Sequence, residues 1–221
     1  MAELKQTPQT TLKRIPDRAS YDRSLAWSII DQALIAHVGI TLESGQPLVV
    51  PTALARRENQ LLVHGSIASR TLNAMAEGTP VCITVTHSDG LVLARSVFES
   101  SMNYRSLVAL GMAQPVTDPE DKRDALKRLT EHLIPGRWAE ARLPTDRELG
   151  ATHVLAMDLD EASVKVRQGP PEDLEKDLTW PVWAGVIPLA MRAGQPAADE
   201  ICDRPTPDYV RDYQKRLDGQ G

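Results

Sequence analysis

The chain has 221 residues, of which 42% are hydrophobic and 25% are charged, so it can bury a core and does not have the composition of a disordered protein. Its net charge of −5 gives no basic field that would attract nucleic acid or anionic lipid. No segment approaches the roughly 20 apolar residues that cross a bilayer, and the N-terminal residues lack the apolar core of a signal peptide, so we expect a cytoplasmic protein without a membrane partner.

The polar N-terminal segment contains Pro8 and Pro16, and we expect residues 1–19 to form an extended arm that packs late or not at all. Apolar side chains at helical spacing, behind a cap at Ser20 or Asp22, predict a helix over 21–35. A β-rich block follows, made of short runs that are rich in β-branched residues and bounded by turn residues. These predicted strands are 36–42, 48–55, 60–65, 80–87, 91–98 and 104–117.

Two features lie between these strands. Asp89-Gly90 predicts a hairpin turn, because glycine tolerates the positive φ that tight turns require. Residues 67–77 are good helix formers that end at Gly78, and they predict a short helix within the sheet.

The second half of the chain adds helices and two more strands. Residues 119–133 open with proline and acids and close with basic residues, which predicts a helix. Residues 138–150 are expected to be irregular or helical, 168–181 to be an exposed loop, and 207–217 to contain a helix. Further strands are predicted at 153–159 and 162–167.

The pattern as a whole predicts a mainly β protein, an antiparallel barrel with peripheral α-helices, because no helical crossover recurs between the strands. We expect three regions: an arm over 1–19, the barrel domain over 20–190 and a C-terminal tail over 191–221.

A strand that ends in a Gly/Ser turn and enters a helix makes 64–70 a candidate phosphate site. Free N–H groups at a helix start favour an anion, Ser66 and Ser69 add hydroxyl donors, and Arg70 adds a charged donor. The alternative is an ordinary N-cap followed by a solvated arginine.

Two other stretches carry candidate ligand contacts. Residues 100–106 combine hydroxyl, amide, aromatic and guanidinium groups, which suits either a polar ligand or an ordinary loop. Trp180 and Trp183 are two of only four tryptophans, and an indole can stack on a flat heteroaromatic ring or pack in a core or subunit interface. Of the two, Trp183 is the better candidate for stacking on a ligand ring.

Several motifs are missing from the sequence. It has no Gly-x-Gly-x-x-Gly, no P-loop and no Gly-x-Ser-x-Gly elbow, which argues against Rossmann, P-loop and serine hydrolase readings. The two cysteines and five histidines do not have metal-ligand spacing, so no metal site is predicted.

Four segments in order, 50–70, 80–113, Lys165 within ASVKVRQG, and WAGVIPL at 183–189, resemble the pyridoxamine 5′-phosphate oxidase-like family, in its flavin-nucleotide-binding and nitroimidazole-resistance-like branch. The resemblance covers about residues 20–190. It implies a six-stranded antiparallel split barrel that forms a homodimer and holds two FMN molecules at the interface, with FAD as the alternative flavin.

The resemblance also implies which residues surround the flavin. The strand at 50–54 would lie along the isoalloxazine ring, and 66–70 would surround the phosphate. Residues from both chains would complete the site, with Trp183 coming from the partner subunit. The implied cofactor-binding set is Pro51, Thr52, Ala53, His64, Ser66, Ser69, Arg70, Asn103, Arg105, Ser106, Lys165 and Trp183.

Two departures from the family pattern limit this comparison. Leu62 stands where relatives often have an aromatic residue, so the pocket lining is expected to differ. The substrate-binding His and Arg pair of genuine pyridoxamine phosphate oxidases has no clear counterpart in 183–221, which argues against oxidation of vitamin B6.

The implied activity is hydride transfer through the flavin to an unidentified small-molecule substrate, with the protein orienting the ring. A flavin or haem carrier or sensor without turnover is the main alternative, because the same barrel occurs in haem-associated relatives. Haem would need an axial ligand, for which His64, His87 and a tail residue are the candidates. The third interpretation is a purely structural dimer whose cleft binds no cofactor.

Overall fold

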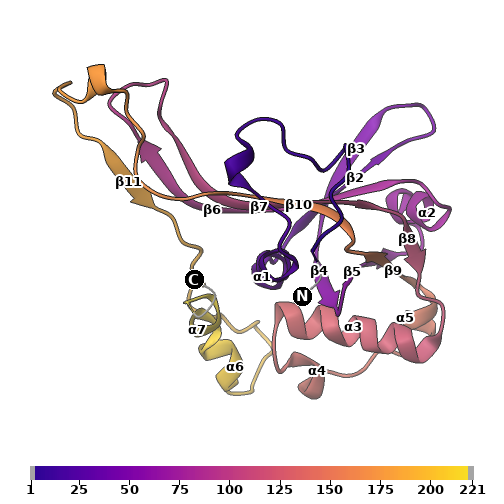
Figure 1. The fold of residues 1–221 in the computed structure, drawn as a ribbon. Coiled ribbons are helices and arrows are strands. Elements are labelled where there is room, and N and C mark those ends of the chain that lie inside the picture. Colours follow the sequence, from indigo (N-terminus) through magenta and orange to yellow (C-terminus); the bar gives the residue numbers. More distant parts are fainter. Residues whose placement is uncertain (1–2, 219–221) are drawn as a thin grey trace.

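The computed structural model describes residues 3–218 (Figure 1) and confirms the mainly β, antiparallel architecture with peripheral helices. The strands are β1 Ala19–Ser20, β2 Ala36–Thr41, β3 Pro47–Thr52, β4 Leu54–Arg57, β5 Gln60–Ser66, β6 Val81–Leu93, β7 Ser101–Gly111, β8 Ala113–Pro115, β9 Thr152–Asp158, β10 Glu161–Arg167 and β11 Gly185–Pro188. The helices are α1 Arg23–Gln32, α2 Arg70–Ala76, α3 Pro119–Leu133, α4 Arg137–Glu140, α5 Asp146–Gly150, α6 Asp208–Arg211 and α7 Tyr213–Asp218, with short 3₁₀ turns at Pro16–Arg18 and Glu175–Asp177.

The strands form two sheets. The larger has the order β1-β10-β7-β6-β2-β3, with β11 paired to β6, and the smaller has the order β4-β5-β9-β8. Ala53 alone separates β3 from β4, so the chain passes from one sheet into the other at this point. The main core lies between these sheets and α1, and its largest fully buried side chains include Ile29, Leu61 and Ile83.

A second, smaller core lies on the other face of the small sheet, where α3 packs (Figure 1). Alternate residues of a strand point to opposite faces, so Leu61 and Val63 of β5 enter the main core while Leu62 faces α3 with Ala125 and Leu129. α3 matches the predicted helix, and its N-cap Asp118 accepts hydrogen bonds from the N–H groups of residues 120 and 121.

The predicted hairpin turn at Asp89-Gly90 is wrong. β6 runs through both residues with a bulge between Ser88 and Gly90, and the chain reverses over 94–100, so only 91–93 of the predicted strand 91–98 is a strand. Gly90 is needed here because β11 lies against it: a Cβ at this position would be 3.0 Å from Cγ1 of Val186 and 3.1 Å from the carbonyl oxygen of Ile187.

Other boundaries also differ from the sequence predictions. The predicted strand 104–117 is divided into β7 and β8, and β7 begins at Ser101, so most of the polar stretch 100–106 is a strand rather than a loop. The helix predicted at 67–77 begins only at Arg70, because Ser69 is its N-cap.

The N-terminal segment is packed rather than loose. Leu4 is 3% exposed and belongs to the main core, and its N–H donates to the carbonyl oxygen of Tyr21. β1 pairs with β10, and Thr10 is also buried. The expectation of an arm that packs late or not at all does not hold for these residues.

The C-terminal helices dock on the end of α3 (Figure 1). The hydroxyl of Tyr213 and the guanidinium of Arg216 both donate to the carbonyl oxygen of Leu133, each at 2.7 Å. The last carbonyls of a helix lack internal partners, so these two groups cap α3. No helix among residues 3–218 is long and apolar enough to span a membrane.

Candidate functional site

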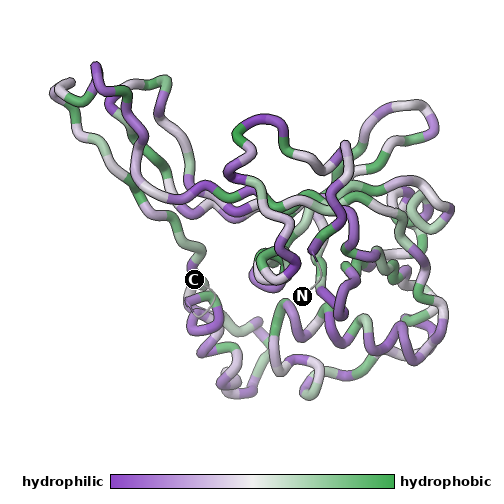
Figure 2. The backbone as a smooth tube through the Cα atoms, in the orientation of Figure 1, coloured by the Kyte–Doolittle hydropathy of each residue, from purple (hydrophilic) through white to green (hydrophobic). Residues whose placement is uncertain are grey.

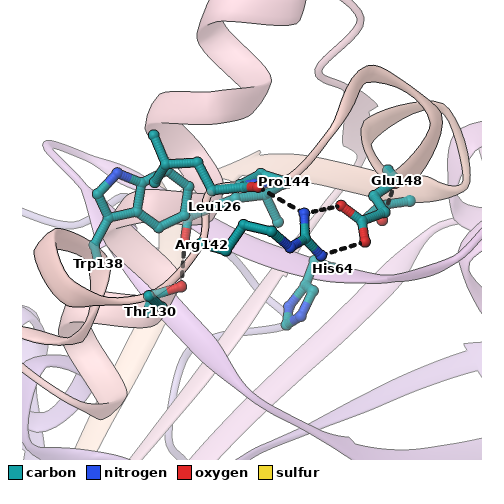
Figure 3. Close-up of a pocket in the computed structure, with 10 residues that line it drawn as sticks. His64, Leu126, Thr130, Trp138, Arg142, Pro144 and Glu148 are labelled. Carbon is teal, nitrogen blue, oxygen red and sulfur yellow. Dashed lines mark hydrogen bonds and ion pairs between the residues drawn. The ribbon is translucent and has the colours of Figure 1, made fainter.

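Two cavities meet at the C-terminal end of β5, and His64 lines both of them. The first, which we call the helix-side cavity, has a volume of about 370 Å³ and lies under α3 and the segment 138–148 (Figure 3). The second, which we call the strand-side cavity, has a volume of about 250 Å³ and lies between the end of β3, the end of β5 and the start of α2. The volume of the helix-side cavity lies within the range for ligand pockets, about 300–1,000 Å³, and that of the strand-side cavity lies just below it.

The strand-side cavity collects five of the residues that the sequence singled out. Its lining comprises Val38, Val50, Pro51, Thr52, His64, Gly65, Ser66, Ser69, Thr71 and Leu72. Pro51, Thr52, His64, Ser66 and Ser69 are the predicted members. Gly65 and Thr71 were not predicted as ligand contacts, although both lie in or next to the segment 64–70 that the sequence analysis singled out.

Local turn chemistry places the two serines. The hydroxyl oxygen of Ser69 accepts a hydrogen bond from the N–H of Leu72, which starts α2, and that of Ser66 accepts one from the N–H of Ala68. A hydroxyl that accepts still has its own proton to donate. Both serines can therefore donate to a ligand in the strand-side cavity without losing their structural hydrogen bonds.

Arg70 and Ala53 lie beside this cavity in the sequence but do not line it. The guanidinium of Arg70 is exposed and forms no hydrogen bond or ion pair with the described residues. It is therefore available to an anion that arrives from solvent or across a subunit interface.

The predicted residues of β7 and β10 have other partners. Arg105 forms a bidentate ion pair with Asp89, with both N–O distances 2.9 Å, and also donates to Gln32 at 2.6 Å. The hydroxyl of Ser106 donates to the carbonyl oxygen of Lys165. Arg105 lines a third cavity of about 610 Å³, which the tail residues 189–191 and 217–218 border.

Asn103 has a structural environment in the single chain. It is 9% exposed, its amide nitrogen donates to the carbonyl oxygen of Gly169 at 3.1 Å, and its amide oxygen accepts from the guanidinium of Arg167. Trp183 lies on the projecting side of the molecule, is 65% exposed, and covers Gly185. No predicted residue from β7, β10 or the tryptophan segment lines the strand-side cavity.

The histidines differ in what their rings contact. Nε2 of His87 lies 2.9 Å from the carbonyl oxygen of Ile29, and Nε2 of His132 lies 2.6 Å from the carbonyl oxygen of Ala33. His153 is bonded through Nε2 to Asn73. His64 is different: it has no hydrogen bond among the described residues, and its Nδ1 is buried without a partner. Burial lowers the pKa of His64, which favours the neutral ring.

The helix-side cavity was not foreseen from the sequence. Its walls include the apolar side chains of Leu126, Trp138 and Leu143, and the Arg142–Glu148 ion pair stands at its edge above the His64 ring (Figure 3). Arg142 holds the pKa of Glu148 at about 2, helped by hydrogen bonds from Thr145. Trp138 is one of four tryptophans and was the one signal in 138–150 that could have indicated a pocket.

Leu62, where an aromatic residue was expected in relatives, is fully buried against α3 and lines neither cavity. Leu62 therefore belongs to the smaller core beneath α3, and the expectation that it alters the pocket lining does not hold for the strand-side cavity.

Two solved structures are similar to this chain over most of its length. The flavocytochrome Anf3 from Azotobacter vinelandii is 37% identical, with a TM-score of 0.87 over 92% of this chain and 95% of Anf3. The FAD and heme binding protein from Mycobacterium smegmatis is 38% identical, with a TM-score of 0.84 over 88% of this chain and 96% of that protein.

A putative 5-nitroimidazole antibiotic resistance protein from Bacteroides thetaiotaomicron is 26% identical, with a TM-score of 0.56 over 67% of this chain and 86% of its own. No curated protein sequence matches the chain. The family profile described as pyridoxamine 5′-phosphate oxidase matches residues 22–166, which is more than half of the chain. Together with the antiparallel sheets, these matches confirm the resemblance: the chain belongs to the pyridoxamine 5′-phosphate oxidase family.

Proposed function

We propose that this protein binds a flavin and uses it for electron or hydride transfer to a small-molecule substrate. The observation that carries the proposal is the convergence of Pro51, Thr52, His64, Ser66 and Ser69 on one cavity. These residues come from β3, β5 and the cap of α2, and the family resemblance in the sequence assigns the same five to flavin binding. Similarity to two proteins whose names include a flavin or FAD supports the same assignment.

The phosphate of the flavin would be held at the mouth of the strand-side cavity. Ser66 and Ser69 offer hydroxyl protons there, and Arg70 offers a guanidinium that no described residue neutralises. Charge-assisted hydrogen bonds to phosphate are among the stronger polar contacts in proteins, about 1.5–3 kcal/mol each. FMN and FAD share this phosphate, and the similarity to an FAD-binding protein favours FAD over the FMN expected from the sequence.

When bound, the flavin supplies the redox chemistry, and the protein supplies position and surroundings. Thr52 and Pro51 form one wall of the cavity, where the strand edge would orient the ring. Asn103, Arg105, Ser106, Lys165 and Trp183 do not reach this cavity within one chain, so in this proposal they act from the partner subunit of a homodimer.

An apolar surface on the projecting arm supports the homodimer. The arm consists of the β6–β7 hairpin, β11 and the segment between β10 and β11, and it extends away from the rest of the molecule (Figures 1 and 2). Val97 is 95% exposed, Phe98 is 90% exposed, and Trp180 and Trp183 are more than 60% exposed. Aromatic side chains are enriched at the centre of protein interfaces, and tryptophan is frequent among the residues that contribute most to binding.

Replacing Phe98 by Asp is expected to weaken self-association by at least about tenfold, because an interface side chain that contributes about 1.4 kcal/mol changes the dissociation constant by that factor. Sedimentation velocity over a dilution series measures the effect. Phe98→Tyr keeps the ring and serves as the matched control, which is expected to dimerise as the wild type does. A monomeric wild type, or an Asp variant that dimerises normally, contradicts the proposed interface.

Binding of a haem in addition to the flavin is the second candidate function. Similarity to a flavocytochrome and to a FAD and heme binding protein covers 92% and 88% of the chain, well beyond the 22–166 of the family profile. His64 is the residue of this chain to consider as a ligand, because it lines the helix-side cavity and imidazole is a common axial ligand of haem iron.

The absorption spectrum of the freshly purified protein, together with mass spectrometry of the small molecule that heat releases, tests the proposed function. Flavin bands with an FAD or FMN mass support it and identify the cofactor, and NADH or NADPH oxidation with nitro, quinone and azo acceptors then tests turnover. A protein that stays colourless after incubation with FMN and with FAD contradicts flavin binding.

A further inference from the structure

The C-terminal segment forms one wall of the third cavity. Its first part is fixed to the large sheet, because the N–H of Leu189 donates to the carbonyl oxygen of Asp89 at 3.1 Å. The chain then leads from β11 to α6 and α7, which lie beside α3 and α4 (Figure 1). Residues 189–191 and 217–218 line one side of the cavity, and residues of α1, β6 and β7 line the other. The two ends of the segment therefore cover the same space.

A small number of polar contacts attach α6 and α7 to the rest of the protein. Tyr213 and Arg216 donate to the carbonyl oxygen of Leu133 at the end of α3. The hydroxyl of Tyr209 donates to the carboxylate of Glu140 on α4. Neither α6 nor α7 contains a buried residue. Elements with few buried apolar contacts open at a lower free-energy cost than the core does, so these two helices are expected to separate from α3 and α4 without global unfolding.

Residues 194–205 form a tether between the cavity wall and α6. All of them are exposed. Within the part of the chain that the structure describes, their hydrogen bonds and ion pair join residues of the tether to one another. Just before the tether, the N–H of Ala193 donates to the side chain of Gln214 on α7 at 2.5 Å, so the two parts of the wall are joined to each other. The tether allows α6 and α7 to move while the sheets stay in place.

The floor of the cavity carries polar groups with unused hydrogen-bonding capacity. Arg105 has five N–H groups, of which two bond to Asp89 and one bonds to Gln32, so two remain. A carbonyl oxygen can only accept, so in the neutral ring of His87 the proton lies on Nε2, 2.9 Å from the carbonyl oxygen of Ile29, and Nδ1 has the lone pair. Among the described residues this Nδ1 has no partner, and protein atoms do not enclose it.

We propose that α6 and α7 are a lid that opens and closes the third cavity and so controls the access of a small, uncharged molecule to His87. The bidentate pair with Asp89 cancels the charge of Arg105, so the floor has no unneutralised charge that would select an ion. The volume of about 610 Å³ lies within the range for ligand pockets. An N–H or O–H group of the ligand would donate to Nδ1 of His87, and a carbonyl group would accept from Arg105. The proposal does not depend on a bound flavin or haem.

The rate at which diethyl pyrocarbonate modifies His87 in the full-length protein tests the lid. This small, uncharged reagent reacts with the imidazole nitrogen that has the lone pair, and mass spectrometry of peptides gives the rate for each histidine at one fixed pH. His37 is exposed on β2 and serves as the internal reference. In the wild type His87 is expected to react about tenfold or more slowly than His37, because the reaction requires the less populated open form.

A variant that releases the lid is expected to expose His87. Tyr213→Phe combined with Arg216→Ala should raise the modification rate of His87 relative to His37 by about tenfold, since an ordinary hydrogen bond shifts an equilibrium by roughly a factor of five and at least two are lost. Lys215→Ala is the matched control on α7. It removes only an exposed ion pair within the lid and should react as the wild type does.

Two further readouts separate lid opening from unfolding. His153 is bonded to Asn73 on α2 and should stay slow to react in every folded variant. In the wild type, the amides of α7 are expected to exchange with deuterium about tenfold or more faster than those of α3, because the lid opens by itself. If the double variant exposes His153 as well, the amide exchange of the wild type decides alone. Equal protection of α7 and α3, a wild-type His87 as reactive as His37, or unchanged His87 reactivity in a folded double variant overturns the lid.

Discussion

Replacement of Arg167 by alanine is expected to lower the free energy of unfolding by about 3 kcal/mol. The side chain is 4% exposed, forms no ion pair among the described residues, and donates to the amide oxygen of Asn103 and to the carbonyl oxygens of Gly169 and Pro170. A buried acceptor that loses its donor costs about 1–3 kcal/mol, and at least two acceptors are affected here. The truncated side chain also leaves a cavity, which adds to the loss.

Urea denaturation of the wild type and the variant measures this change as a lower midpoint at an unchanged slope. Arg128→Ala is the matched control: it removes an exposed ion pair with Asp124 on α3 and is expected to cost less than about 0.5 kcal/mol. If both substitutions lower the free energy of unfolding by the same small amount, the hydrogen bonds of Arg167 to Asn103, Gly169 and Pro170 do not stabilise the fold as expected.

Replacement of Arg70 by alanine is expected to weaken flavin binding by roughly 10- to 100-fold while the dimer stays intact. The guanidinium forms no hydrogen bond or ion pair with the described residues, so its removal breaks no contact that stabilises the single chain. A charge-assisted bond to phosphate of about 2 kcal/mol corresponds to a factor of about 30 in the dissociation constant. Fluorescence titration of the apoprotein with FMN and with FAD gives the two affinities.

Arg14→Ala controls for the change in net charge, because Arg14 is also exposed and lies in the N-terminal segment away from the strand-side cavity. It should leave the flavin affinity within about twofold of the wild type, as expected for a single distant charge screened by salt. Unchanged flavin occupancy in Arg70→Ala would remove the phosphate assignment from 66–70 and return this segment to the simpler reading of a helix cap with a solvated arginine.

Local chemistry explains which elements could be predicted. α3 carries its own signals, with Asp118 as the cap, Pro119 at its first position and the apolar spacing of Ala125 and Leu129, and its predicted boundaries are correct. The turn at Asp89-Gly90 shows the opposite case. The dipeptide has the local signature of a hairpin, but Gly90 is required by β11, whose residues lie almost a hundred positions further along the chain.

The candidate site shows the same division. Ser66 and Ser69 were found because the turn that precedes α2 has a recognisable pattern, and they line the same cavity. Trp138 and Arg142 were missed, since nothing near them in the sequence indicates that the segment 138–144 folds over the end of β5. The prediction that Asn103 contacts the flavin stays untested, and its buried bonds to Gly169 and Arg167 add a structural role.

The sequence by itself determined the antiparallel β class, the helix α3 and the family, because periodicity, capping and ordered motifs are encoded by residues close together in the chain. Only the tertiary structure decided that His64 lines two cavities, that β11 packs against Gly90, and that the tail caps α3 through Tyr213 and Arg216. Each of these depends on contacts between segments far apart in sequence, which are fixed by the packing of whole sheets and helices and leave no local pattern.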